Sequence, residues 1–258
     1  MSASRTLAET LCSERRNHIS GGIYHRMQVD FAYNSNHIEG SRLTHDQTRY
    51  IFETHTVGIE PANVNDVFEA ANHFRCFDRI LDTLGKPITE DDCKTLHSML
   101  KAGVLHDDDD SIVIGDYKRF PNEVGSIETV LPEDVPARMQ ALLESVADRT
   151  PDLYDILDFH AKFEQIHPFY DGNGRIGRLL MLRQCLTAGI VPFIVDDRNK
   201  MLYYRGLREW QTGGQKGYLL DTALFLQDDM KELLDRFRID YDHRDVRARD
   251  ILREHGIG

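Results

Sequence analysis

The stretch IHPFYDGNGRIGRLL, Ile166 to Leu180, joins two helical patterns through a turn that is rich in glycine. It carries an imidazole at His167, a carboxylate at Asp171 and guanidinium groups at Arg175 and Arg178. Glycines remove the side chains that would keep a ligand from the backbone, and the first free N–H groups of a helix point outward toward such a ligand. This turn therefore predicts an anion-binding site.

The sequence on both sides of the turn predicts helices. From Leu153 to Ile166, apolar residues mostly recur at three- and four-residue spacing, as on an amphipathic helix. This helix is expected to stop at His167, because Pro168 pushes its predecessor out of the right-handed helical region. The next helix is expected to begin between Asn173 and Arg175 and to run to Gly189, where a left-handed terminal residue fits.

Similar helical patterns cover much of the remaining chain and predict an all-α, predominantly helical protein. They span residues 63–84, 89–100, 136–147 and 219–239. The exception is DYKRFPNEVGSIETVLPEDV, Asp116 to Val135, which we interpret as a β-hairpin flap. The acidic run Asp107 to Asp110 lacks the alternating ligands and the glycine of an EF-hand, so a solvated loop is favoured over a calcium site.

Charge and composition restrict the partners that we expect. A formal charge of −12 and a pI near 5.4 argue against binding to nucleic acid or to an anionic membrane. No apolar run approaches the length of a membrane span, and the N-terminus carries no secretory pattern. The four cysteines are scattered and are interpreted as reduced thiols. A cytoplasmic location is the expectation.

The charged groups around the turn suggest a reaction. Arg175 and Arg178 project from the first turn of the helix, where both can hold phosphate oxygens. Asp171 would repel those phosphates unless a cation lies between them, and Mg²⁺ is commonly held in this way. His167 is placed to take a proton from an incoming hydroxyl group. Together these residues favour nucleotidyl or phosphoryl transfer, although each of them alone has an ordinary structural interpretation.

The segment HPFYDGNGRIGR resembles the signature of the Fic family, H-P-F-x-[D/E]-G-N-G-R-x-x-R, with every fixed position present. The resemblance covers roughly Thr89 to Leu226. Most members with the complete signature transfer AMP from ATP to a Ser, Thr or Tyr hydroxyl of a protein, on a helical fold with a β-hairpin flap. The resemblance thus implies a protein adenylyltransferase that uses ATP and Mg²⁺ and acts on a protein substrate, itself included.

Individual roles carry over by position in the signature. The resemblance implies that His167 is the general base, that Asp171 holds magnesium, and that Phe169 anchors the loop. The expected nucleotide-binding residues are Gly172, Asn173 and Gly174 in an anion hole, with Arg175 and Arg178 on the β and γ phosphates.

Two further segments complete the site that the resemblance implies. The flap residues Val124, Gly125, Ser126 and Ile127 are expected to clamp a target segment by strand addition. The preceding GDYKR, from Gly115, departs from the family's usual GxYR pattern, so target recognition cannot be carried over from the family with the rest of the site.

Tyr203 and Tyr204 are expected to line the adenine pocket. The alternative, which stays open for each of them, is a position in the hydrophobic core.

A second motif lies far upstream, in NSNHIEGSRLTHDQT. Thr44 and Gln47 form a capping box that starts a helix, and Gly40 is expected to end the preceding one. Glu39 then lies at a helix end where exposed carbonyl groups disfavour an anion, so it needs a cationic partner.

The pattern S-x-x-x-E-G, with Ser35 on the same helix face as Glu39, resembles the inhibitory motif of one Fic class. In that class the glutamate pairs with the second arginine of the signature, here Arg178, and holds ATP in an unproductive pose. Ser41 replaces the usual asparagine after the glycine. A surface glutamate near a helix end is the alternative.

Several alternatives remain open at this point. Removal of AMP from a modified protein would use the same residues, and a catalytically silent nucleotide-binding module is a further possibility. Phosphotransfer and phosphocholine transfer are disfavoured by Gly174 and Gly172, because the branches with those activities alter these positions.

We expect a helical region at 1–86, a catalytic core at 87–230 and a charged helical extension at 231–258, all in one unit. Homo-oligomerisation is left open.

Overall fold

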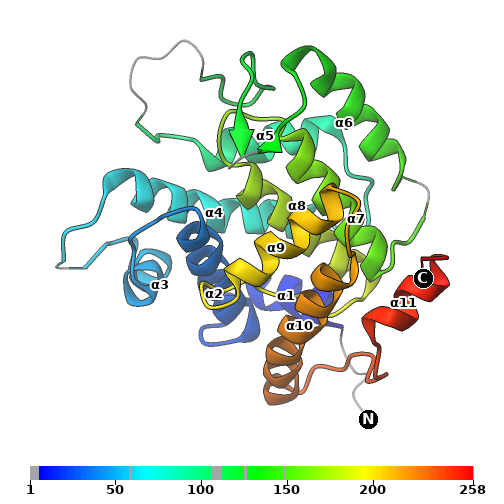
Figure 1. Ribbon diagram of the computed structural model, residues 1–258. Coiled ribbons are helices and arrows are strands. Elements are labelled where there is room, and N and C mark those ends of the chain that lie inside the picture. Colours follow the sequence, from blue (N-terminus) through cyan, green and yellow to red (C-terminus); the bar gives the residue numbers. More distant parts are fainter. Residues whose placement is uncertain (1–5, 59, 106–111, 125–126, 148, 258) are drawn as a thin grey trace.

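Helix α8, Asn173–Ala188, lies at the centre of the fold and is buried along almost its whole length (Figure 1). The computed structural model describes residues 6–58, 60–105, 112–124, 127–147 and 149–257. A helix buried on all sides needs packing partners on all sides. Its partners are α1 (Leu7–Arg16), α2 (Ile23–Ile38), α4 (Val64–Asp82), α5 (Glu90–Leu100) and α7 (Leu153–Ile166).

The other elements surround this central group. They are α3 (His45–Thr54), a 3₁₀ turn (Pro132–Asp134), α6 (Val135–Glu144), α9 (Lys200–Gln211), α10 (Gly217–Phe237) and α11 (Ala248–Glu254). Two short strands, β1 (Glu123–Val124) and β2 (Ile127–Glu128), pair antiparallel in the described part of the chain. Gly125 and Ser126 of the expected flap lie outside the described residues, as does the acidic run 107–110.

The predominantly helical class is confirmed, and the ends of the two helices around the signature agree with the sequence prediction. Helix α7 stops before His167, which leaves the right-handed region at φ 51° and ψ 60°. Helix α8 ends at Gly189, at φ 70°. Thr44 and Gln47 form the predicted capping box at the start of α3. The predicted boundary at 231 falls inside α10, which continues without interruption to Phe237.

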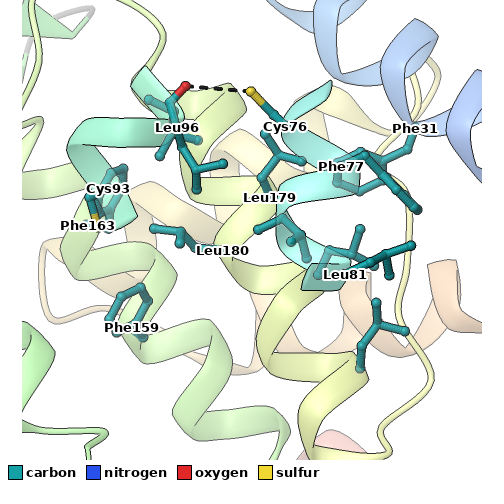
Figure 2. Close-up of a cluster of buried hydrophobic side chains, with 14 of the residues drawn as sticks. Phe31, Cys76, Phe77, Leu81, Cys93, Leu96, Phe159, Phe163, Leu179 and Leu180 are labelled. Carbon is teal, nitrogen blue, oxygen red and sulfur yellow. Dashed lines mark hydrogen bonds between the residues drawn. The ribbon is translucent and has the colours of Figure 1, made fainter. Parts of the chain in front are cut away.

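The main hydrophobic core fixes α8 against its neighbours. In one cluster, part of which is drawn in Figure 2, Phe77 of α4 and Phe163 of α7 lie with Leu179 and Leu180 of α8, all fully buried. A second cluster joins α7 and α8 to α9, α10 and α11, and a third joins α2, α3 and α4. Because close-packed side chains resist displacement, the N-terminus of α8 is held in a fixed place.

Among the described residues, no helix combines the length and apolar character needed to cross a membrane.

A buried arginine connects α8 to the loop between α4 and α5. The Arg183 side chain is 2% exposed. Its guanidinium donates to the carbonyl oxygens of Thr83, Lys86 and Pro87 at 3.0–3.1 Å and to Asp92 at 3.2 Å. Buried carbonyl groups need such donors, because burial without a partner is costly. Arg183 therefore holds the entrance of α5 against the central helix.

We expect Arg183→Met to lower the free energy of unfolding by about 3 kcal/mol or more, because it leaves several buried carbonyl groups without their donor and removes a charged partner of Asp92. Urea denaturation measures this change. The matched control is Arg198→Met, since Arg198 also pairs with an aspartate but is 82% exposed in its side chain. The control should change stability by less than about 0.5 kcal/mol, and equal losses in the two variants would contradict the anchoring role.

Candidate active site

The signature turn is held by hydrogen bonds within its own residues. Asn173 accepts a hydrogen bond from the backbone N–H of Phe169 and donates one to its carbonyl oxygen, both at 2.8 Å. Gly172 precedes α8 in the left-handed region at φ 83°, where a side chain would be strained. The Asp171 carboxylate accepts from the backbone N–H of Gly172 at 2.6 Å. These contacts fix the path of the chain between His167 and α8.

Phe169 occupies the anchoring position that the sequence analysis assigned to it. Its side chain is fully buried, and its ring stacks on that of His97 from α5, with centroids 4.2 Å apart. The His97 Nδ1 accepts from the backbone N–H of Gly115 at 2.9 Å. Burial lowers the pKa of His97 to about 4, so this ring is neutral near pH 7 and can accept that bond.

Arg178 and Glu39 form an ion pair between α8 and the end of α2. The Arg178 side chain is 3% exposed, and its Nη2 donates to the Glu39 Oε1 at 2.7 Å. The remaining contacts go to Ser35: Nε donates to its hydroxyl oxygen at 3.1 Å and Nη2 to its carbonyl oxygen at 2.8 Å. Burial by itself would lower the pKa of Arg178, but the Glu39 carboxylate raises it. The structure thus brings together Ser35, Glu39 and Arg178 across more than a hundred residues.

Gly174 gives the Glu39 carboxylate room to reach this position. A Cβ atom at residue 174 would collide with the Glu39 Oε1 and would approach the Arg178 Nη1 to 2.9 Å. The carboxylate therefore lies against the first turn of α8, at the positive end of that helix. The Glu39 carboxylate is thus an anion beside the turn for which the sequence predicted an anion-binding site.

Arg175 belongs to a different charged network. Its guanidinium contacts Glu69 of α4 and the Asp171 carboxylate, the latter at 3.3 Å from Nη2. Lys101, the residue that follows α5, contacts the same two carboxylates, with its Nζ 2.5 Å from the Glu69 Oε1. The side chains of Arg175, Lys101 and Glu69 are 4%, 3% and 13% exposed, whereas that of Asp171 is 53% exposed. The ring of alternating charges therefore faces solvent at Asp171.

The Asp171 carboxylate is suited to holding a hard cation. Burial would raise its pKa, but Arg175 and Lys101 lower the pKa to about 2, so the group is ionised at any physiological pH. A half-exposed, ionised carboxylate beside a helix N-terminus is a donor of the kind that Mg²⁺ uses together with phosphate oxygens. The residues present thus fit the expected magnesium position.

His167 lies in a partly buried position between α7 and the turn. Burial, and to a lesser extent the Lys118 ammonium, lower the pKa of its imidazole to about 4, while Glu39 and Asp171 act in the opposite direction. The neutral imidazole is the form that can accept a proton. His167 is therefore present in the basic form near pH 7.

The base of the hairpin is attached to the signature loop. Lys118 donates its backbone N–H to the Pro168 carbonyl oxygen at 2.8 Å, and its buried ammonium donates to Asn122 and Thr129 at 2.7 Å. The Asn122 amide reaches the Phe169 carbonyl oxygen at 3.3 Å. The segment that leads into β1 and out of β2 is thereby fixed next to His167.

The two tyrosines of α9 occupy different environments. Tyr203 is 1% exposed and lies in the core cluster of α7 to α11, with its hydroxyl 2.5 Å from the His160 Nε2. This is the core alternative that the sequence left open. Tyr204 is 41% exposed, and its ring packs against Tyr203 with centroids 5.5 Å apart. Only Tyr204 of the pair is exposed to solvent.

The sequence analysis missed Lys101, Glu69 and His97. Lysine and glutamate are almost never buried unless they are paired, but the spacing of apolar residues does not show that Glu69 in α4 and Lys101 after α5 are buried. The sequence also does not identify the partners of these charged residues. Glu69 and Lys101 lie 32 positions apart, and their contacts with Arg175 and Asp171 each span 70 positions or more.

Comparisons with known proteins agree with this geometry. Residues 87–185 match the family model described as Fic/DOC family. Curated relatives include the protein adenylyltransferase Fic of Nematostella vectensis, 29% identical over 197 residues, which are 74% of this chain and 45% of the relative. The same protein of Drosophila erecta is 29% identical over 212 residues, with 80% and 41% covered. The chain spans less than half the length of these curated relatives.

Solved structures show the same fold. A Fic domain containing signaling protein from Bacteroides thetaiotaomicron superimposes with a TM-score of 0.68 at 21% identity, over 92% of this chain and 99% of the other. Fic-1 from C. elegans superimposes with a TM-score of 0.70 at 20% identity, over 90% and 72%. The family match, the curated relatives and the signature geometry together place residues 87–185 of this chain in the Fic/DOC family.

Proposed function

We propose that this chain is a protein adenylyltransferase that transfers AMP from ATP to a Ser, Thr or Tyr hydroxyl of a target protein, and that Glu39 represses it. The observation that carries the proposal is the Arg178–Glu39 ion pair beside the glycine turn, because it couples a predicted phosphate ligand to a predicted inhibitor. The names of the curated relatives support the same activity. The acidic charge of the chain supports a protein target rather than nucleic acid.

The proposed reaction is an exchange at the α-phosphorus of ATP. The target hydroxyl oxygen forms a bond to that phosphorus, the bond to the oxygen that bridges to the β-phosphate breaks, and pyrophosphate leaves. His167 takes the hydroxyl proton, which its neutral imidazole can accept. The first backbone N–H groups of α8, together with Arg175 and Arg178, would bind the phosphate oxygens.

Asp171 would hold magnesium, which when bound neutralises phosphate charge and fixes the phosphate chain. The exposed side chain of Tyr204 would contact the adenine, whereas Tyr203 supports Tyr204 from the core.

The hairpin that carries Val124 and Ile127 would clamp the target segment by strand addition. Its attachment to the signature loop through Lys118 supports a position next to His167.

Repression follows from competition for one guanidinium. Arg178 directs its Nη2 to Glu39 and its Nε to Ser35, so the donors that would hold a γ-phosphate are already engaged. Removing the carboxylate leaves a buried cation without its charged partner, and such a cation strongly favours a new anion. The γ-phosphate of ATP is that anion in this proposal.

Transfer of label from α-labelled ATP with Mg²⁺ tests the function. We expect strong self-labelling or labelling of extract proteins by Glu39→Gly, at least about tenfold above wild type, because Arg178 becomes free to orient the phosphates. Adding His167→Ala should remove the labelling by removing the base. Glu60→Gly, at an exposed loop position, is the matched control and should behave as wild type.

No labelling by any variant, alone or in cell extract, would overturn the transferase proposal. In that case AMP-modified extract proteins should be tested for AMP release by the wild type, in which Glu39 would orient water. ATP binding without either activity would indicate a silent nucleotide-binding module.

The pKa of His167 provides an independent test. An NMR titration of the imidazole, assigned by comparison with His167→Ala, should give a pKa of about 4 instead of the ordinary 6.5. Because burial and the Lys118 ammonium both disfavour the charged ring, Lys118→Met should move the pKa upward. A midpoint near 6.5 in the wild type would mean that the imidazole is solvated, contrary to its position in the structure.

A further inference from the structure

Lys101 lies where a divalent cation at Asp171 would feel its charge, because its ammonium contacts the same carboxylate. The Lys101 ammonium is buried at the end of α5, in contact with the Asp171 Oδ2 and 2.5 Å from the Glu69 Oε1. Arg175 contacts the same two carboxylates. Two cations and two carboxylates therefore balance within this network, before any ligand is bound.

The network is closed on the protein side and open on one side only. Lys101, Glu69 and Arg175 are nearly or largely buried, whereas the Asp171 side chain is 53% exposed. A cation can thus approach the Asp171 carboxylate from solvent, but the Lys101 ammonium already contacts that same carboxylate. Repulsion between like charges a few ångströms apart is substantial in a partly buried site.

A nucleotide changes this balance. Its phosphates bring several negative charges to the start of α8, where they offset the repulsion between Lys101 and a divalent cation. Glu69 can retain the Lys101 ammonium while Asp171 turns to the new cation, because the two carboxylates contact the ammonium independently. No buried charge is left unpaired in either state, which is the condition for a low-cost exchange.

We propose that Lys101 is a positioning residue that acts as the resident counter-ion of Asp171 and makes binding of the divalent cation depend on bound nucleotide. This inference rests on the proposed function, in which Asp171 holds magnesium with the phosphates. Free metal is excluded from the resting site, and the metal enters together with ATP. Lys101 touches no substrate in this account and acts only through Asp171.

Binding of Mn²⁺, measured without nucleotide from the electron paramagnetic resonance signal of the free ion, tests the proposal. Lys101→Met should bind Mn²⁺ at Asp171 at least about tenfold more tightly than the wild type, because one unit of opposing charge is lost. Combining it with Asp171→Asn should remove the gain. The matched control is Lys94→Met, because Lys94 of the same helix also bridges two carboxylates, Glu90 and Asp116, at 2.7 and 2.8 Å.

Equal or weaker Mn²⁺ binding by folded Lys101→Met would overturn the proposal, as would a similar gain in Lys94→Met. If Lys101→Met does not fold by circular dichroism, Lys101→Gln removes the charge while retaining a hydrogen-bond donor, and the same gain is expected of it.

A second arm with a non-hydrolysable ATP analogue separates this inference from the function on which it rests. If Asp171→Asn leaves nucleotide-dependent Mn²⁺ binding unchanged, the proposed role of Asp171 fails whatever Lys101 does. If Asp171→Asn abolishes that binding while Lys101→Met matches the wild type without nucleotide, only the inference about Lys101 fails.

Discussion

A buried guanidinium must have an anion, and the arrangement of this site depends on which anion Arg178 has. Its side chain is 3% exposed and inside the packed centre of the fold. Leaving such a cation unpaired would cost several kcal/mol. In the structure the anion is Glu39, from the end of a helix that begins about 150 positions earlier. The pair therefore fixes α2 against the start of α8 and places a carboxylate beside the anion cradle.

The two arginines of the signature are neutralised in separate ways. Arg178 pairs with Glu39 across a gap that Gly174 keeps open, and Arg175 pairs with Glu69 and Asp171, which Lys101 also contacts. The consequence is a phosphate site whose charges are satisfied before phosphate arrives. Binding then requires exchange of anions, and a substitution that removes a resident carboxylate is expected to lower stability as well as to change binding and catalysis.

The sequence predicted the parts of the fold that local rules determine. Apolar spacing and caps gave the helices around the signature, and Pro168 and Gly189 gave their ends, because the backbone preferences of those residues act over a single turn. The Glu39–Arg178 pair was predicted only through the family resemblance. The contacts of Lys101 and Glu69 were missed, since a buried ion pair between distant helices leaves no periodic signal.

Other features needed the packing of the whole chain. Both Tyr203 and Tyr204 fit a helix, and only the position of α9 against α7 shows that Tyr203 is buried and Tyr204 is exposed. The domain boundary expected at 231 rested on charge composition, yet α10 continues through it, because Leu234 still packs in the core. Composition alone does not show where a long amphipathic helix loses its packing partners.

The central claim is that Glu39 withholds Arg178 from the γ-phosphate of ATP. The dissociation constant of ADP divided by that of ATP measures this most directly, because the two ligands differ in that phosphate alone. Calorimetry with Mg²⁺ should give a ratio near one for the wild type and about ten for Glu39→Gly. In Glu39→Gly with Arg178→Ala the ratio should return to near one. A ratio that Glu39→Gly leaves unchanged, or a gain that persists without Arg178, would contradict the account.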